Sequence, residues 1–305
     1  MDNPEPSLVI CDLVKSYGSI RGVDGVSFSV SEGEIFGLLG PNGAGKTSLL
    51  ECALGLREAD GGSVRIGGLD AREHPREVKL RIGAVLQSTA LQDAITAREA
   101  LELFGEFYPN GVPAERLLER FGLMEKAGAP FETLSGGERQ RLALAFVNDP
   151  KLLFLDEPTS GLDPQVRREL HEDIRRFRAE GRSVLLTTHY IEEAHALCDR
   201  IAILHRGRIV AMGRPDELVG RSASCTRVIV QAAKGLDAGT VGGLAGVIAA
   251  AEVEGKLVVE TQDTGRAIIE LVQYLGRTGN ELMDLQVRKP SLEDVFIELT
   301  GDRSK

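Results

Sequence analysis

The sequence has few cysteines and no long apolar run, which bears on disulfide, zinc and membrane-spanning structures. It has no tryptophan and only four cysteines in 305 residues, and the cysteines lie far apart with no CxxC pair. This spacing excludes a zinc ribbon or a dense disulfide framework and fits a reducing cytosol. The longest uncharged apolar stretch, residues 238–251, is rich in glycine and too short to span a bilayer. The N-terminus, MDNPEPS, is unlike a signal peptide. We therefore expect a cytoplasmic chain that does not cross a membrane by itself.

Basic residues are also in the minority. The chain carries 36 Lys and Arg against 46 Asp and Glu, a formal net charge of −10. A nucleic-acid-binding protein usually needs a basic face, so the composition argues against nucleic acid as a partner. Residues 221–305 hold 10 basic and 12 acidic side chains, so the last part of the chain hides no basic module.

The hydrophobic content of 42% and the charged content of 27% are typical of a globular chain, and the length predicts two domains. Short apolar runs alternate with helical patterns, as in a sheet with crossover helices. Closely spaced glycines predict antiparallel hairpins among the early strands, and continuous apolar runs predict buried parallel strands later. The expected strands are residues 8–14, 23–30, 34–39, 63–66, 82–86, 152–155, 183–187 and 201–205, and residues 164–180 read as an amphipathic helix.

The pattern changes near Gly220, which divides the chain into domains 1–220 and 221–305. The pattern of residues 221–305 predicts a small α+β domain of the ferredoxin-like split βαβ type. Its glycine-rich segment before residue 252 has no clear pattern. The expected strands are residues 226–231, 256–261 and 282–287, and the expected helices are residues 266–275 and 292–299.

A glycine-rich loop follows the apolar strand at residues 35–39. It matches GxxxxGK[ST], in which glycines let backbone N–H groups converge on phosphate oxygens at a helix N-terminus. Lys46 would neutralise phosphate charge, and Thr47 would offer its hydroxyl to Mg²⁺. The alternative is a glycine-rich turn with a chance Lys-Thr pair, but the strand and helix on either side favour a phosphate site. The expected nucleotide-binding residues are Gly40, Pro41, Asn42, Gly43, Ala44, Gly45, Lys46, Thr47 and Ser48.

A second buried strand, KLLFL, ends in two carboxylates, Asp156 and Glu157. Asp156 is placed to hold Mg²⁺, and Glu157 to orient or deprotonate an attacking water. The alternative is that Asp-Glu-Pro only ends the strand in a turn. The phosphate loop upstream favours the catalytic interpretation.

The segment LSGGERQ, residues 134–140, begins a helix. Ser135 and Glu138 have the spacing of a capping box. Gly136 and Gly137 would each cost on the order of 1 kcal/mol in the first helical turn relative to Ala, yet they expose N–H groups to an anion. The chain then has two phosphate-binding helix starts for one evident nucleotide. One solution is that the second start serves the nucleotide of another subunit.

These segments together resemble one family. LSGGERQR, the phosphate loop, LDEPTSGLDP at 155–164 and Thr188-His189 are similar to the ATP-binding subunit of an ABC transporter, over about residues 7–220. The resemblance implies a P-loop ATPase cassette with a RecA-like core, an antiparallel β-subdomain and a helical subdomain at about 88–150. It also implies a homodimer in which each ATP lies between the phosphate loop of one subunit and Ser135-Gly136-Gly137 of the other.

The resemblance assigns four more residues. Tyr17 matches the aromatic residue that stacks on adenine, and Gln87 matches the glutamine that links Mg²⁺ and water to the membrane subunit. Asp163 matches an aspartate that reaches across the dimer, and it is also a good N-cap before Pro164. His189 matches the γ-phosphate-sensing histidine. The expected catalytic residues are Lys46, Gln87, Glu157 and His189, and the expected Mg²⁺ ligands are Thr47, Gln87 and Asp156.

The last helical segment, PSLEDVFIELTG at 290–301, resembles the end of ATPases that serve ABC-2-type exporters, including the daunorubicin-resistance type. From its residues alone it is an amphipathic helix that packs on the small C-terminal domain. The resemblance implies a cytoplasmic subunit, peripheral on the inner face of the membrane. It would drive a separate membrane permease that exports a drug, an antibiotic or another hydrophobic or amphipathic substrate.

The alternative is an ABC ATPase that does not transport, associated with translation or DNA repair. A repair-type ATPase would need a long coiled coil between the phosphate loop and LSGG, but Ser135 follows Lys46 by only 89 residues without sustained heptads. A translation-type protein usually carries two cassettes in one chain, and this chain carries one.

Overall fold

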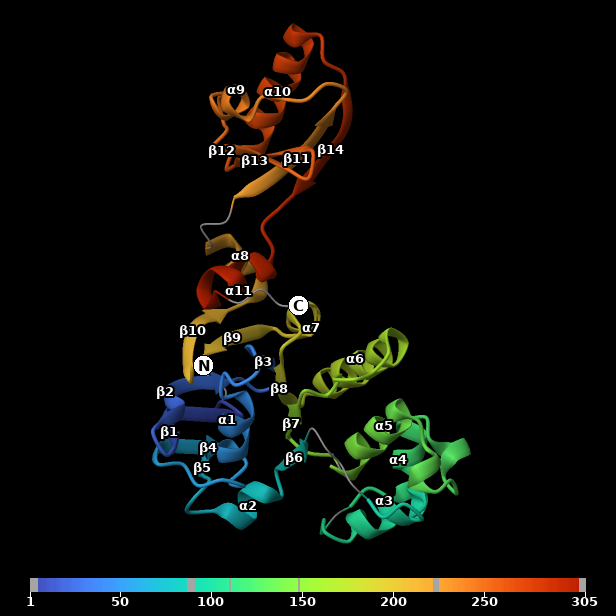
Figure 1. Cartoon of the computed structure of the whole chain (residues 1–305). Helices are drawn as coiled ribbons and strands as arrows, with labels where there is room; N and C mark the ends of the chain where they lie inside the picture. The colour runs from blue at the N-terminus through green and yellow to red at the C-terminus, as the bar shows by residue number, and fades with distance from the viewer. Residues whose placement is uncertain (1–4, 87–90, 110, 148, 222–224, 302–305) are drawn as a thin grey trace. The chain divides into compact units, whose positions relative to one another are not determined.

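The computed structural model describes residues 5–86, 91–109, 111–147, 149–221 and 225–301. It divides the chain into two compact units, residues 1–215 and 216–305 (Figure 1). The division lies five residues before the one read from the sequence, inside the first turn of α8 (Pro215–Arg221). Within the described ranges, no helix has both the length and the apolar character that crossing a membrane requires.

The first unit contains an antiparallel sheet in the order β2-β1-β4-β5. Its first two strands form the hairpin that the early glycines predict, closing at the pair Tyr17–Ile20 around Gly18, whose φ is +60°. Large apolar side chains on this sheet, including Leu8, Ile10 and Leu13, are fully buried against the phosphate-loop helix. The strands are β1 (Leu8–Tyr17), β2 (Ile20–Val30), β4 (Gly61–Ile66) and β5 (Leu69–Asp70).

The second sheet of this unit has the order β10-β9-β3-β8-β7-β6. Five of its strands are parallel, and β10 pairs antiparallel with β9 at one edge. Every residue of β3, β7 and β8 is buried, as their continuous apolar runs predict. The strands are β3 (Ile35–Leu39), β6 (Ile82–Val85), β7 (Leu152–Asp156), β8 (Ser183–Thr188), β9 (Arg200–His205) and β10 (Arg208–Gly213).

The strand order decides where the chemistry gathers. β3, β8 and β7 are neighbours, and their carboxyl ends lead into the phosphate loop, His189 and the Asp156-Glu157 pair. Ligands of open parallel sheets bind at this edge. The helices that flank the sheet are α1 (Lys46–Ala53), α2 (Pro75–Lys79), α6 (Pro164–Ala179) and α7 (Ile191–Leu197).

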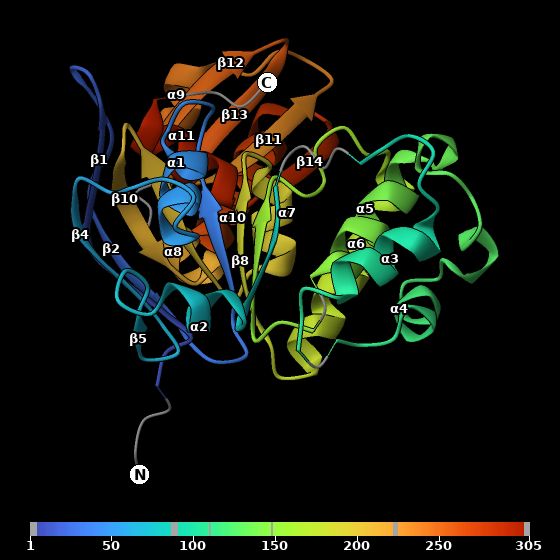
Figure 2. The ribbon, with the colours of Figure 1, turned by 90° about the horizontal axis from the view of Figure 1, so that it is seen from below.

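A layer of helices lies beside this sheet, as Figures 1 and 2 both show. It falls inside the helical subdomain expected at about 88–150. Phe104 stacks on Phe146 with ring centroids 4.5 Å apart, which joins the first and last of these helices. They are α3 (Ala97–Gly105), α4 (Ala114–Arg120) and α5 (Gly136–Phe146), with short 3₁₀ turns at Met124–Lys126 and Phe131–Thr133.

The second unit is a βαββαβ module, and its antiparallel sheet has the order β12-β13-β11-β14. The order of elements along the chain and the order of strands in the sheet are both those of the ferredoxin-like split βαβ, which confirms the expected type. The sequence pattern missed α9 and β12, which lie in the glycine-rich segment. The elements are β11 (Thr226–Ala232), α9 (Ala238–Gly242), β12 (Ala249–Val253), β13 (Lys256–Thr261), α10 (Thr264–Thr278) and β14 (Leu282–Arg288).

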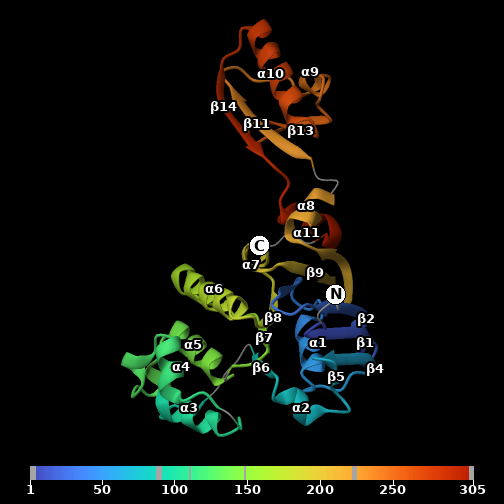
Figure 3. The same cartoon turned by 180° about the vertical axis from the view of Figure 1, so that it is seen from behind.

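The final helix, α11 (Leu292–Thr300), forms where the pattern predicts it, and Gly301 ends it with a φ of +71°. The helix belongs to the C-terminal unit, as expected. Leu292, Val295 and Phe296 are buried, yet none of them belongs to the described core cluster of the β11–β14 sheet. Asp294 of α11 lies 3.5 Å from Arg227 of β11, and Figures 1 and 3 show the helix where the chain continues from β14. The amphipathic pattern therefore predicted the helix but could not show which surface covers it.

Candidate nucleotide site

Two glycines of the phosphate loop are required by close backbone contacts. Gly45 is the N-cap of α1 and has a φ of +104°, which strongly favours glycine. A Cβ atom on Gly45 would lie 2.0 Å from the carbonyl oxygen of Gly22, and one on Gly40 would lie 2.4 Å from that of Leu204. The loop can therefore pass this tightly from β3 into α1 only with glycine at these positions.

Lys46 is buried at the start of α1, with 5% of its surface exposed. Its ammonium donates hydrogen bonds to the carbonyl oxygens of Gly40, at 2.8 Å, and Pro41, at 3.2 Å. It also lies 3.3 Å from Oε1 of Glu157. Burial lowers the pKa of Lys46, and the nearby Glu157 and Asp156 carboxylates act in the opposite direction. The loop and the end of β7 thus hold the ammonium group of Lys46 in a fixed position.

Asp156 ends β7 in a buried position and faces two hydroxyl groups. Thr47 Oγ1 lies 3.2 and 3.4 Å from its two carboxylate oxygens. Thr187 donates to Oδ1 at 2.5 Å from the adjacent strand β8, where the two residues are register partners. Carboxylate and hydroxyl oxygens are hard ligands of the kind Mg²⁺ prefers, so this group fits that ion.

Glu157 is held by its backbone in an uncommon conformation. Its φ is +47°, a region that costs a non-glycine residue on the order of 1 kcal/mol or more. Its N–H donates to both the carbonyl oxygen and the hydroxyl of Thr187, at 3.1 and 3.0 Å. His189 Nδ1 lies 3.1 Å from Oε2 of Glu157, although the two groups are not aligned for a hydrogen bond. The carboxylate therefore stands between Lys46 and His189.

Thr187 is the residue of this group that the sequence interpretation missed. It stands inside the apolar strand SVLLTT and resembles an ordinary strand residue. A hydroxyl residue at the carboxyl end of a buried strand is the signal that could have found it. Only the pairing of β8 with β7 shows that its side chain supports both Asp156 and the backbone of Glu157.

Tyr17 lies at the end of β1, beside the phosphate-loop helix. Its hydroxyl donates to Ser48 Oγ at 2.9 Å, and the residue is 39% exposed. The guanidinium of Arg57 lies 5.3 Å from the ring centroid, a contact that the sequence interpretation did not include. Asp60 accepts hydrogen bonds from Lys15 at 2.9 Å and from the backbone of Ser16 at 2.6 Å, which ties this end of β1 to the segment after α1.

The LSGG segment forms the capping box that its sequence predicts. Ser135 Oγ accepts from the backbone of Glu138, and the Glu138 carboxylate accepts from the backbone of Ser135. The two glycines differ. A Cβ on Gly137 would lie 2.4 Å from Val166 of α6, whereas a Cβ on Gly136 would meet only Leu162, at 3.7 Å. Gly137 thus has a packing role that the sequence does not show.

Asp163 caps α6 by accepting from the backbone of Gln165 and Val166, both at 3.0 Å. Together with Ser135 and the two glycines it forms a second group, at the starts of α5 and α6. Across the described ranges, no hydrogen bond or ion pair joins this group to the phosphate loop of the same chain. Gln87 lies outside the described residues.

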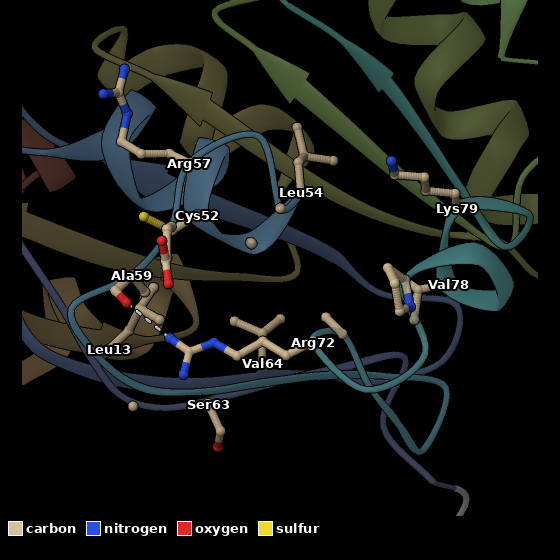
Figure 4. A pocket seen from close by; sticks show the side chains of 16 residues that line it. Leu13, Cys52, Leu54, Arg57, Ala59, Ser63, Val64, Arg72, Val78 and Lys79 are labelled. Carbon is tan, nitrogen blue, oxygen red and sulfur yellow. Dashed lines mark hydrogen bonds between the residues drawn. The ribbon is translucent and has the colours of Figure 1, made fainter.

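A separate cavity of about 400 Å³ lies between the end of α1 and the antiparallel sheet (Figure 4). Its wall is mainly apolar, with Leu13, Leu54, Val64 and Val78 among its residues. The side chain of Arg72 donates a hydrogen bond to the carbonyl oxygen of Ala59 at 2.9 Å, as Figure 4 shows, so this guanidinium is already engaged by the protein. The cavity contains none of the phosphate-loop residues 40–48, so the loop and not this cavity is the candidate site.

The fold and the site define a P-loop ATPase. A family model described as "ABC transporter" matches residues 23–160. The daunorubicin resistance ATP-binding protein DrrA2 of Streptomyces coeruleorubidus is 39% identical, over 95% of this chain and 94% of that protein. The Nod factor export ATP-binding protein I of Ralstonia nicotianae is also 39% identical, over 97% and 94%.

Solved structures agree with these relatives. An ATP-binding subunit of an ABC transporter is 30% identical with a TM-score of 0.64, over 70% of this chain and 92% of that one. A dimeric ATP-binding cassette in a post-hydrolysis state with ADP and Pi is 26% identical with a TM-score of 0.61, over 68% and 98%. The chain belongs to the ATP-binding subunits of ABC transporters, which are ATPases.

Proposed function

We propose that this chain is the ATPase of an ABC-2-type exporter whose cargo is a drug, an antibiotic or another hydrophobic or amphipathic compound. One observation carries the proposal: the relatives named for daunorubicin resistance and for Nod factor export match this chain nearly from end to end, the C-terminal unit included. The alternative of a translation- or repair-associated ATPase has no support among these relatives. The chain would act on the cytoplasmic side, peripheral to the membrane, by driving a separate permease.

The site residues divide the chemistry of hydrolysis. Lys46, already held by the loop carbonyls, would bind the terminal phosphates, and Thr47 and Asp156 would hold Mg²⁺. When bound, Mg²⁺ would supply positive charge against the phosphate oxygens. Glu157 would orient the attacking water and accept its proton, and His189 would bind the γ-phosphate beside it. Tyr17 would stack on the adenine. Gln87 would complete the metal and water contacts.

Ser135, Gly136, Gly137 and Asp163 would serve the nucleotide of a second subunit. Their separation from the phosphate loop of their own chain supports this role, and so does the dimeric relative. Two copies would then enclose two ATP molecules, each shared between the phosphate loop of one copy and the LSGG helix start of the other.

The decisive experiment is Glu157→Gln. The amide is nearly isosteric with the carboxylate but cannot accept the proton, so the variant should keep Mg-ATP and lose hydrolysis. Without hydrolysis, Mg-ATP should hold a closed dimer that light scattering detects and that ADP does not support. Adding Ser135→Arg places bulk and charge where the second subunit approaches the phosphate and should abolish that dimer. A Glu157→Gln protein that hydrolyses ATP at the wild-type rate would remove Glu157 from the chemistry.

The exporter assignment needs its own readout. Co-expression of the chain with its membrane permease should lower accumulation of a fluorescent amphipathic drug in cells. The Glu157→Gln chain, expressed to the same level, is the matched control and should leave accumulation unchanged. Equal accumulation with both chains would count against drug export while leaving the ATPase intact.

A further inference from the structure

β14 is an edge strand of the C-terminal sheet and is open on its outer side. It pairs with β11, and no other described strand pairs with it. None of its seven residues is buried. Two large apolar side chains of the strand are exposed, Met283 at 66% and Val287 at 43%. Unpaired backbone groups next to exposed apolar side chains make a template for another strand.

After one irregularity at its start, between Leu282 and Asp284, β14 offers a regular edge. It contains no proline, and its register with β11 is continuous from Asp284 to Arg288. The opposite edge of the sheet is β12, which pairs with β13 and has α9 beside it. β12 also exposes an apolar side chain, Val253 at 52%, but it has no basic residue that could pair with its acidic Glu252 across a two-fold axis.

The sequence of β14 is complementary to itself when it is read antiparallel. A two-fold axis at Gln286 places Asp284 opposite Arg288 of a second copy, and the reverse pair forms on the other side of the axis. Leu285 then lies opposite Val287. Moving the register by two residues in either direction sets Asp284 opposite Gln286 or Pro290 and removes both charge pairs. Opposite charges across a strand pair stabilise it, so this register is selected over its neighbours.

We propose that β14 pairs antiparallel with β14 of a second copy of this chain, about a two-fold axis at Gln286. The two four-stranded sheets become one sheet of eight strands. This contact goes beyond the proposed function, because it lies in the C-terminal unit and needs no nucleotide. It keeps two cassettes linked after hydrolysis and so raises the effective concentration of one cassette near the other.

The charged groups of β14 are free to take part in this pairing. Asp284 accepts a hydrogen bond from the side chain of its neighbour Gln286 at 2.9 Å, and Arg288 lies 3.8 Å from Glu293. Both contacts are local and lie on the surface, with Arg288 56% exposed. Surface contacts of this kind are weak, so pairing with a second strand can replace them.

The first experiment uses charge reversal in the full chain without nucleotide. The Ser135→Arg background removes the ATP-dependent dimer, and sedimentation velocity then measures the remaining association. Asp284→Arg and Arg288→Asp each place like charges opposite one another twice, and each should weaken the dimer at least tenfold. The double variant restores both pairs with reversed sign and should recover it. A dimer that persists in both single variants lies on another surface and overturns the proposal, as does a wild-type chain that stays monomeric.

Cross-linking tests the register directly. At a two-fold axis the two copies of residue 286 are opposite neighbours, with Cα atoms within disulfide reach. Gln286→Cys, in a chain whose Cys11 and Cys225 are serine, should form a disulfide dimer under mild oxidation. Glu252→Cys on β12 is the matched control on the opposite edge and should stay monomeric. If Gln286→Cys cross-links no faster than Glu252→Cys, the proposal is overturned. This result holds even if the charge variants fold poorly.

Discussion

The ammonium of Lys46 lies 3.3 Å from the carboxylate of Glu157, and both side chains are largely buried. One residue comes from the phosphate loop and the other from the end of β7, so this pair joins the two halves of the candidate site. The ammonium is also bonded to two loop carbonyls. Phosphate oxygens that enter the loop would meet a cation that is already positioned, which lowers the cost of ordering it on binding.

Lys46→Ala should remove hydrolysis and weaken ATP binding. Loss of a charge-assisted contact of about 1.5–3 kcal/mol corresponds to roughly a tenfold to hundredfold weaker affinity. Fluorescent-nucleotide titration and phosphate release measure the two effects. Lys79→Ala removes the same charge from an exposed position in α2 and should change neither. Wild-type turnover in Lys46→Ala would disprove the phosphate-loop assignment.

Thr187→Val should impair catalysis more than ATP binding. Valine keeps the shape of threonine but loses the hydroxyl that donates to Asp156 and accepts from the backbone of Glu157. Misplacement of these groups should lower kcat by on the order of tenfold to a hundredfold, with a smaller change in KM. Thr187→Ser keeps the hydroxyl and should retain most of the activity. If valine and serine behave alike in steady-state assays, the hydroxyl has no positioning role.

The two glycines of LSGG should respond oppositely to alanine. Gly137→Ala puts a methyl group against Val166 and should destabilise the fold by about 1–3 kcal/mol. Gly136→Ala meets only ordinary contacts and gains helix propensity, so it should stabilise by up to about 1 kcal/mol. Thermal unfolding of the two nucleotide-free variants compares them directly. Equal midpoints would show that α5 does not pack on α6 as described.

Asp60 should add a pH-dependent contribution to stability. The hydrogen bond from Lys15, followed by that from the backbone of Ser16, lowers the pKa of Asp60 below its ordinary value of 3.8. A carboxylate with a lowered folded-state pKa stabilises the fold above its unfolded pKa, and the contribution disappears as the pH falls through the folded value. Asp60→Asn should therefore lower the unfolding midpoint at pH 6 but not at pH 2.

Lys15→Met is the partner control for Asp60. It removes the main cause of the lowered pKa, so it should shift the acid-dependent loss of stability toward higher pH. Because Asp60 also fixes the end of β1, both variants should weaken ATP binding through Tyr17. A wild-type pH profile in Asp60→Asn would contradict the assignment of this interaction.

Much of the fold and the candidate site could be read from local sequence. The phosphate loop needs glycines at set positions because its backbone turns within a few residues. Gly45 and Lys46 can therefore be recognised from the sequence alone, since the whole motif is contiguous. Ser135 and Glu138 cap their helix across three residues. Buried parallel strands show as continuous apolar runs. In the C-terminal unit, the glycine-rich segment hid α9 and β12, because neither has a clear hydrophobic period.

The sequence by itself determined the class of ATPase, the residues of the phosphate loop and the presence of a second, mixed α and β unit. Those features depend on contacts within one turn, one strand or one helix. Only the tertiary structure decided that Thr187 supports Asp156 from 31 residues away, that Gly137 makes room for Val166, and that β14 is an open edge. Each of these depends on which strand or helix becomes a neighbour, and neighbours distant in the chain are chosen by packing of the whole unit rather than by local pattern.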